Sequence, residues 1–279
     1  MRLHMTRVTK QWFSVGMAAA LCWGAGPSEA GNVGGRGYET GYENIVRLTG
    51  DLYRALNAQR RQRLLSMPVL LEKMDVPFVA PSEFSDGSNS WRAVFISTGF
   101  VDLVNYLSHA KAIDTTQRGF LDQYVSALSA ETGVKPLTAV SLQSNAQHWS
   151  FQTMNCQAGT FNQMVGALIA IDMAHHYLGH YDKYARRLHD SENRAVPIAS
   201  VITPAEWREA LMKGARNALD CGLSIEGVIV LYESIEKMPA RPAWTIFFLP
   251  KEPAVQVTQL KKDLRRLEKA FFAGSKTGL

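Results

Sequence analysis

The chain has 279 residues, 46% of them hydrophobic, which suits one large domain or two small ones with a substantial core. Its formal net charge of +5 is too mild to indicate binding to nucleic acid. The composition therefore favours a globular protein and gives no reason to expect a nucleic-acid partner.

Residues 1–30 are predicted to be a secretory signal peptide. Its features are a basic start, an apolar core and a small-x-small cleavage site: Arg2, Arg7 and Lys10, then residues 12–23, then Ser28-Glu29-Ala30. Cleavage before Gly31 would leave 27 Lys plus Arg and 24 Asp plus Glu, a net charge of +3. An uncleaved anchor is the competing interpretation, but the apolar run is only about half of the ~20 residues that a span needs.

We therefore expect an exported protein, periplasmic or secreted, with no membrane span after signal removal. Residues 31–279 are expected to form a single, mainly helical domain. Cys156 and Cys221 are then the remaining thiols. In an oxidising compartment two such cysteines often pair, and closing a loop this long would stabilise the fold by roughly 4 kcal/mol. Two buried, unpaired thiols are the alternative.

The first predicted helix spans residues 42–65, where Ile45, Leu48, Leu52 and Leu56 recur at helical spacing. An arginine cluster, Arg60, Arg61 and Arg63, crowds its end, where cations suit the helix dipole. These arginines are predicted to form a solvated face, with an acidic partner as the alternative.

Extended segments come next. Residues 68–81 contain three prolines and predict an extended connection or an edge strand, and the polar residues 82–90 predict a loop. Residues 91–97 are β-rich and predict a strand. Thr98-Gly99 then turns the chain into a predicted helix over residues 100–112.

The second half is predicted to be mostly helical, over residues 117–129, 160–188, 204–220, 225–237 and 256–272. Thr203-Pro204-Ala205-Glu206 is a strong helix start, and Gly222 is expected to end that helix in the left-handed conformation. Short strands are expected at residues 138–142 and 241–250. The expected fold class is α+β, mainly α, with a small sheet.

Three of the seven histidines lie within residues 169–181. His176 and His180 are four residues apart, so on one helix they share a face and can bind one metal ion. His175 should point about 100° away from His176 around the helix. Asp172 lies one turn before His176, where a carboxylate can orient a metal-bound imidazole from outside the ligand shell.

The order of several segments resembles the zinc metallopeptidases of the CAAX-prenyl-protease type, a gluzincin family. These segments are a strand leading into a Thr-Gly helix at 93–103, the histidine helix at 174–180, an acidic helix start at 206–211 and a glycine turn at 218–226. The resemblance covers residues 89–238. It implies a zincin-like fold and a zinc ion held by His176, His180 and Glu206, although anchoring the comparison on Gly222 would put Trp207 in the third ligand position.

The family motif H-E-x-x-H reads His-Tyr-Leu-Gly-His here, so Tyr177 replaces the glutamate that acts as general base. General-base catalysis contributes about 10²–10⁴-fold, and a phenol with a pKa near ~10 is a poor base at neutral pH. His175 points the wrong way to replace it.

The resemblance therefore implies an exported metallopeptidase-like protein without normal peptidase activity that binds protein or peptide clients in the cell envelope. One alternative is an active zinc-dependent peptidase with a non-standard general base. The other is a helical envelope protein that binds no metal.

Overall fold

The computed structural model describes residues 38–86, 89–128, 134, 145–188, 196–250 and 256–275. Its contacts divide the chain into residues 1–35 and residues 36–279, and every described residue belongs to the second unit. The expected signal peptide and the strand expected at 138–142 lie outside the described residues. Within the described part, no helix combines the length and the apolarity needed to cross a bilayer.

The described part of the chain is α+β and mainly helical, as expected. Its α-helices are α1 (Tyr38–Ala55), α2 (Ala58–Leu64), α3 (Thr98–Asp114), α4 (Phe120–Ala127), α5 (Phe151–Tyr177), α6 (His180–Tyr184), α7 (Pro204–Asp220), α8 (Glu226–Lys237) and α9 (Val257–Ser275). Its strands are β1 (Val69–Glu72), β2 (Val79–Asp86) and β3 (Asn89–Ser97). Short 3₁₀ turns cover Ala146–Trp149, Ala185–Arg187, Ile198–Ser200 and Ala243–Phe247.

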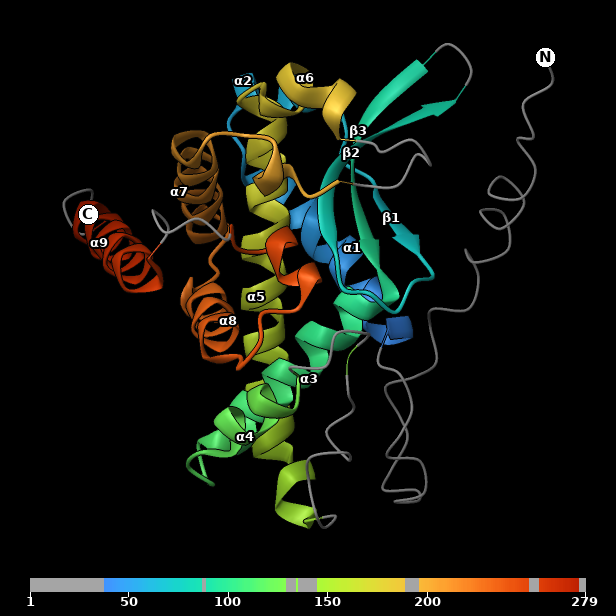
Figure 1. Cartoon of the computed structure of the whole chain (residues 1–279). Coiled ribbons are helices and arrows are strands. Elements are labelled where there is room, and N and C mark those ends of the chain that lie inside the picture. Colours follow the sequence, from blue (N-terminus) through green and yellow to red (C-terminus); the bar gives the residue numbers. More distant parts are fainter. Residues whose placement is uncertain are drawn as a thin grey trace, which may run out of the picture. The chain divides into compact units, whose positions relative to one another are not determined.

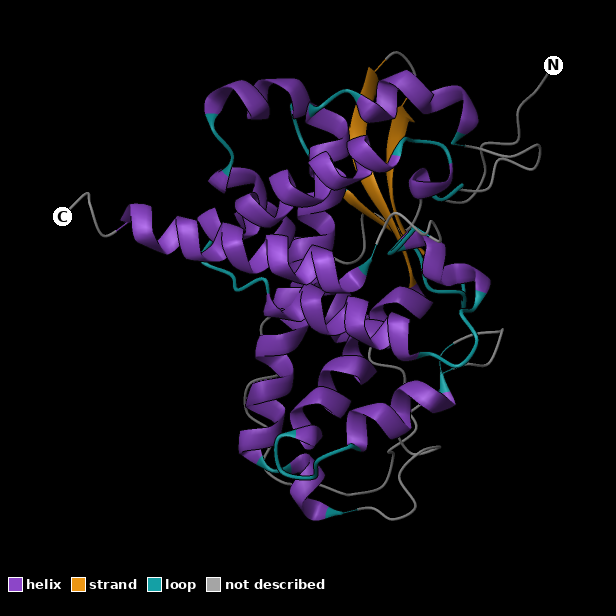
Figure 2. Cartoon of the chain, turned by 60° about the vertical axis from the view of Figure 1, so that its left-hand side comes forward, coloured by secondary structure: helices purple, strands orange, loops and turns teal. Residues whose placement is uncertain are grey.

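Helix α5 is the central element, and α1, α3, α7 and α8 pack along it (Figure 1). Every residue from Met164 to Tyr177 is buried, which is why this stretch is apolar nearly all round instead of amphipathic. The three strands lie together in one sheet (Figure 2), and β2 and β3 both contact α5. The histidine-bearing part of α5 is therefore enclosed by other elements.

The sheet has the order β1–β3–β2, with β1 parallel and β2 antiparallel to β3. Pro81 lies in β2, whose strand neighbour in this sheet is β3 alone, so the predicted edge strand is confirmed. The loop predicted at residues 82–90 is wrong over most of its length. The two strands continue to Asp86 and from Asn89, because Phe84 and Trp91 stack across the ladder with ring centroids 5.8 Å apart.

Strand β3 passes directly into α3, as the strand, Thr-Gly and helix pattern predicts. The Oγ of Ser97 accepts hydrogen bonds from the backbone N–H groups of Phe100 at 2.9 Å and Phe78 at 3.0 Å. Gly99 is required here, because a Cβ at this position would lie 2.1 Å from the carbonyl oxygen of Asp75. This close approach fixes the start of α3 against the β1–β2 connection.

The predicted helix over residues 42–65 is in fact two helices. α1 ends at Ala55, and the side chain of Asn57 caps α2 by accepting a hydrogen bond from the N–H of Arg60 at 3.0 Å. An asparagine cap offers the backbone a local alternative to continuing the helix, which the hydrophobic spacing alone does not reveal.

Two further expectations are corrected. The helix expected over 117–129 is shortened to α4, because Gly119 adopts the left-handed conformation with φ +87° just before it. The strand expected over 241–250 contains a 3₁₀ turn at Ala243–Phe247 instead. The hydroxyl of Thr245 donates to the carbonyl of Pro242 at 2.8 Å, which favours the turn.

Candidate functional site

The histidine cluster lies where α5 ends. Gly179 has φ +80°, a left-handed conformation that interrupts the helix expected over residues 160–188. α5 therefore ends at Tyr177, and His180 starts the separate helix α6. His176 and His180 are on different helices, so the expectation that they share one helical face is wrong.

His180 contacts His175 instead of His176. The Nδ1 atoms of the two rings are 3.1 Å apart, so one ring donates the hydrogen bond and the other accepts it. Burial lowers the pKa of both histidines, and for His175 the neighbouring His180 lowers the pKa further. This neutral pair therefore joins the end of α5 to the start of α6.

His176 is bound to the sheet. Its Nε2 donates a hydrogen bond to the carbonyl oxygen of Ala93 in β3 at 3.0 Å. Its Nδ1 is buried without a hydrogen-bond partner, and its ring lies 4.8 Å from that of Tyr181. Burial lowers the pKa of His176 to about 3. The imidazole is a neutral link between α5 and β3.

Glu206 lies at the start of α7 in the predicted capping box with Thr203, which the structure confirms. Its carboxylate also accepts hydrogen bonds from Lys183 at 2.6 Å and from the hydroxyl of Tyr184 at 3.0 Å. Burial would raise the pKa of Glu206, but the hydrogen bonds from Lys183, Thr203 and Tyr184 lower it to about 2. Glu206 thus joins α6 to α7.

The predicted ligands His176, His180 and Glu206 do not fit a zinc site in this arrangement. Each already uses polar atoms of its side chain in a hydrogen bond to another protein group. Within the described residues, no group of three or more His, Cys, Asp or Glu side chains is placed to hold a metal ion. The carboxylate of Glu209 lies near His180, with its Oε2 3.9 Å from His180 Nε2.

Tyr177 is the last residue of α5. Its hydroxyl is buried without a hydrogen-bond partner, and burial raises its pKa to about 12. The guanidinium of Arg60 lies over the ring, 5.0 Å from the centroid, and Arg63 donates to the Tyr177 carbonyl at 2.7 Å. A buried phenol with this raised pKa has no means to activate water at neutral pH.

Asp172 does not orient the His176 ring. The Oδ2 of Asp172 and the Nδ1 of His176 are both buried without a hydrogen-bond partner. The hydroxyl of Tyr232 in α8 is a third unpartnered buried atom, and its pKa is raised by burial and by Asp172. Burial raises the pKa of Asp172 well above its usual value, because it disfavours the charged carboxylate.

Asp172→Asn is expected to stabilise the protein at neutral pH, because the unfolded chain ionises Asp172 there and burial opposes that ionisation in the folded protein. The gain is about 1.4 kcal/mol for each pH unit above ~4 over which the folded carboxyl group keeps its proton. A carboxyl group whose pKa is raised on folding makes its full contribution to the free energy of unfolding below its pKa in the unfolded chain. That contribution is lost as the pH rises towards its pKa in the folded protein. The gain from Asp172→Asn should therefore shrink to nothing near pH ~4. Urea unfolding of both proteins across this range measures it, and a gain independent of pH would contradict the expectation.

For two residues of the site, the sequence analysis missed the contacts that the structure shows. His175 was expected to point away, yet it makes the closest histidine contact. Arg92 of β3 joins Glu83 at 2.6 Å to Asp182 of α6 at 2.5 Å, and its guanidinium lies 5.3 Å from the ring centroid of Tyr181. The contact of His175 with His180 could have been suspected from Gly179, because glycine commonly ends helices. Nothing in the neighbouring sequence indicates the ion pairs of Arg92.

The disulfide expected between Cys156 and Cys221 is not formed. Both thiols are free: Cys156 is exposed on α5, and Cys221, the residue that ends α7, is partly buried. The alternative of two buried thiols is therefore also wrong for Cys156.

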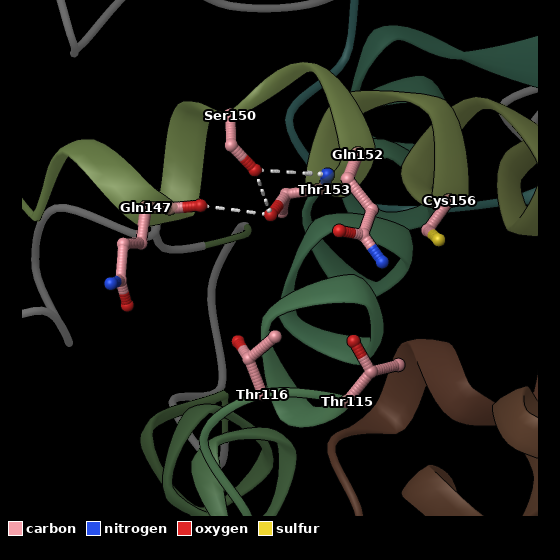
Figure 3. A pocket seen from close by; sticks show the side chains of 7 residues that line it. All are labelled: Thr115, Thr116, Gln147, Ser150, Gln152, Thr153 and Cys156. Carbon is pink, nitrogen blue, oxygen red and sulfur yellow. Dashed lines mark hydrogen bonds between the residues drawn. The ribbon is translucent and has the colours of Figure 1, made fainter.

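A cavity of about 290 Å³ lies at the other end of α5 from the histidines. Figure 3 shows hydroxyl and amide side chains around it, and none of its lining residues is charged: Thr115, Thr116, Gln147, Ser150, Gln152, Thr153 and Cys156. Its hydroxyls mostly bond within their own segments, since Ser150 caps α5 and Thr153 donates to the Gln147 carbonyl at 2.8 Å. The cavity is therefore lined by neutral polar groups and is separate from the cluster of His175, His176 and His180.

The described residues define an α+β, mainly helical protein in which His175, His176 and His180 hydrogen-bond to other protein groups. No protein-family model, curated protein or solved structure matches this chain.

Proposed function

We propose that this chain is an exported, metallopeptidase-like protein that hydrolyses no peptide bonds and binds protein or peptide segments in the cell envelope. The observation that carries the loss of hydrolysis is the state of Tyr177. It stands where the peptidase motif has its general base, and it is a buried phenol with a pKa of about 12. The engaged side chains of His176, His180 and Glu206 support the same conclusion.

The arrangement of elements supports kinship with zincin-like peptidases. The long helix α5 ends just after His175 and His176, beside a small sheet. Helix α7 brings Glu206 and Glu209 to that end of α5. Strand β3 leads through Thr98-Gly99 into α3, and the order of these pieces is the one the resemblance implies.

The edge strand β2 supports peptide binding. It pairs with β3 on one side only within the described sheet. An extended peptide can add to such an edge through backbone hydrogen bonds, which bind many sequences without needing a catalytic group. Pro81 removes one donor from this edge, so the added strand would pair on the carbonyl side at that point.

Zinc content and peptide cleavage test the proposal together. The purified full-length protein is assayed against a degenerate library of fluorogenic peptides, with and without a chelator, and its zinc is measured by mass spectrometry. We expect no cleavage and far less than one zinc per chain. Tyr177→Glu is expected to stay as inactive as Tyr177→Phe, because restoring the acid does not bring the metal ligands together.

Retention of the same peptides on immobilised protein tests the binding half. Saturable retention that free peptide competes away supports the proposal. Cleavage that a chelator stops would establish the active peptidase instead. The metal-free helical envelope protein would be established if peptides are neither cut nor retained and His180→Ala changes neither zinc content nor stability.

A further inference from the structure

Helix α2 presents three positive charges that no described carboxylate neutralises. Between Asp51 and Glu72 the sequence has four arginines and no acidic residue. Arg54 is paired with Asp51, but among the described residues no acid lies within 4.0 Å of the other three, the arginine cluster Arg60, Arg61 and Arg63. All arginines of α1, β3, α7 and α9 form ion pairs: Arg47, Arg54, Arg92, Arg208, Arg216, Arg265 and Arg266. Four further arginines share the cluster's lack of an ion pair among the described residues, but they are not gathered on one helix: Arg118, Arg186, Arg187 and Arg241.

The cluster is held in place and is not a loose surface feature. Arg63 donates to the carbonyl of Tyr177, and Arg60 lies over the Tyr177 ring. Leu64 is buried and anchors the end of α2 in the core. Arg61 makes neither of these contacts with Tyr177 and is exposed. α2 is therefore fixed to the end of α5, where Arg61 and Arg63 are exposed and Arg60 is partly buried.

Leu65 directly follows α2 and exposes a large apolar side chain to solvent. Its side chain is 73% exposed. In the described part of the chain, Leu65 is the one residue other than glycine that has a positive φ, which is +59°. Such a backbone conformation is strained for a leucine. Two hydrogen bonds hold it: Leu65 N–H donates to the Arg61 carbonyl at 2.9 Å, and the Tyr53 hydroxyl donates to the Leu65 carbonyl at 2.9 Å.

We propose that the arginine cluster and Leu65 form a docking surface for an anionic lipid membrane. The guanidinium groups complement lipid phosphates, and Leu65 enters the interfacial region between headgroups and acyl chains. A nucleic acid would complement the arginines but offers no apolar region beside its phosphates for Leu65, whereas a membrane offers both. An acidic protein is the alternative that the test below addresses. This contact is peripheral, and it does not depend on peptide binding or on the histidine cluster.

Vesicle co-sedimentation tests the proposal. The full-length protein is mixed with vesicles of phosphatidylcholine alone, or of phosphatidylcholine and phosphatidylglycerol in equal parts, at low and high salt. Binding is expected only to the anionic vesicles, and more weakly at high salt. Arg61→Gln is expected to weaken binding about fivefold and Leu65→Gly about tenfold.

Leu65→Gly separates docking from a structural role. Glycine accepts a positive φ without strain, so this variant should keep or raise the melting temperature while losing membrane affinity. The matched control combines Lys262→Gln with Phe272→Ser on α9, which removes one exposed charge and one exposed apolar side chain elsewhere. Every variant shares residues 1–37 with the wild type, so any contribution of that segment cancels.

The outcomes divide cleanly. Selective loss in the Arg61 and Leu65 variants supports the proposal. It is overturned if the α9 control loses binding and the α2 variants do not, or if neutral vesicles bind equally. It is also overturned if Arg61→Gln weakens binding to DNA or to an acidic peptide while the wild type leaves anionic vesicles unbound.

Discussion

Replacing Gly214 by alanine is expected to lower the free energy of unfolding by about 2–3 kcal/mol. Gly214 lies in α7 where that helix crosses α5. A Cβ at this position would lie 2.6 Å from both the Cα and the N of Ile171 and 2.8 Å from the carbonyl carbon of Ala170. These are backbone atoms in the buried part of α5, so they have no rotamer to change, and the two helices must separate.

Gly159→Ala is the matched control for this substitution. Gly159 is also inside a helix, α5, but it is exposed and a Cβ there would meet nothing within 4 Å. Alanine should raise the free energy of unfolding at this position by about 0.5–1 kcal/mol, because it restricts the unfolded chain. Urea unfolding followed by circular dichroism gives both values. Equal effects of the two substitutions would show that α5 and α7 do not make this close contact.

Acid is expected to destabilise the protein steeply as the pH falls below about 6.5, the usual pKa of histidine. The pKa of His176 falls to about 3 on folding, and burial holds that of His175 well below its usual value. In this pH range the unfolded chain takes up protons that the folded chain excludes. Each histidine then lowers the free energy of unfolding by about 1.4 kcal/mol per pH unit, or about 3 kcal/mol for the two together.

Acid lowers the free energy of unfolding because the folded protein holds these histidines in their neutral form. Their contribution is complete above pH ~6.5 and is lost on acidification, for His176 down to a pH of about 3. Glu206, whose pKa of about 2 lies below its usual value of 4.5, begins to lose its contribution only below that usual value, so the histidine effect is read above pH ~4.5.

His176→Gln provides the comparison for the acid effect. Glutamine keeps a donor for the Ala93 carbonyl but does not titrate, so the variant should be less stable at pH 7 yet lose less on acidification. Asp172 has the opposite effect, because its raised pKa makes the folded protein more stable on acidification. Both proteins contain Asp172, so this effect cancels when their pH dependences are compared. Urea midpoints measured at intervals from pH 7 to pH 4 give the two slopes. Parallel slopes would mean that His176 is not kept neutral by folding.

Much of the local structure was predictable because its causes lie close together in the sequence. Thr203, Pro204 and Glu206 predict the start of α7, and the capping box is confirmed there. Gly222 predicts the end of the same helix and has φ +82°. The passage from β3 into α3 and the mainly helical class were also predictable, because a cap, a glycine or a hydrophobic period acts within one or two turns.

The candidate site was predictable only in part. The sequence brought His175, His176, His180 and Tyr177 to attention and showed that the general base of the resembling motif is replaced. It did not show which histidines meet, because that depends on Gly179 leaving the helical conformation. It also did not show that Arg60 and Arg63, more than a hundred residues earlier in the chain, cover Tyr177.

The sequence by itself determined the mainly helical class, the strand before α3 and the two ends of α7. Only the tertiary structure decided that His176 bonds to Ala93, 83 residues away in the sequence, and that His180 meets His175. The physical reason is that caps and periodicity act through neighbouring backbone groups. A buried side chain instead bonds to whichever polar group the packing of distant elements brings within reach.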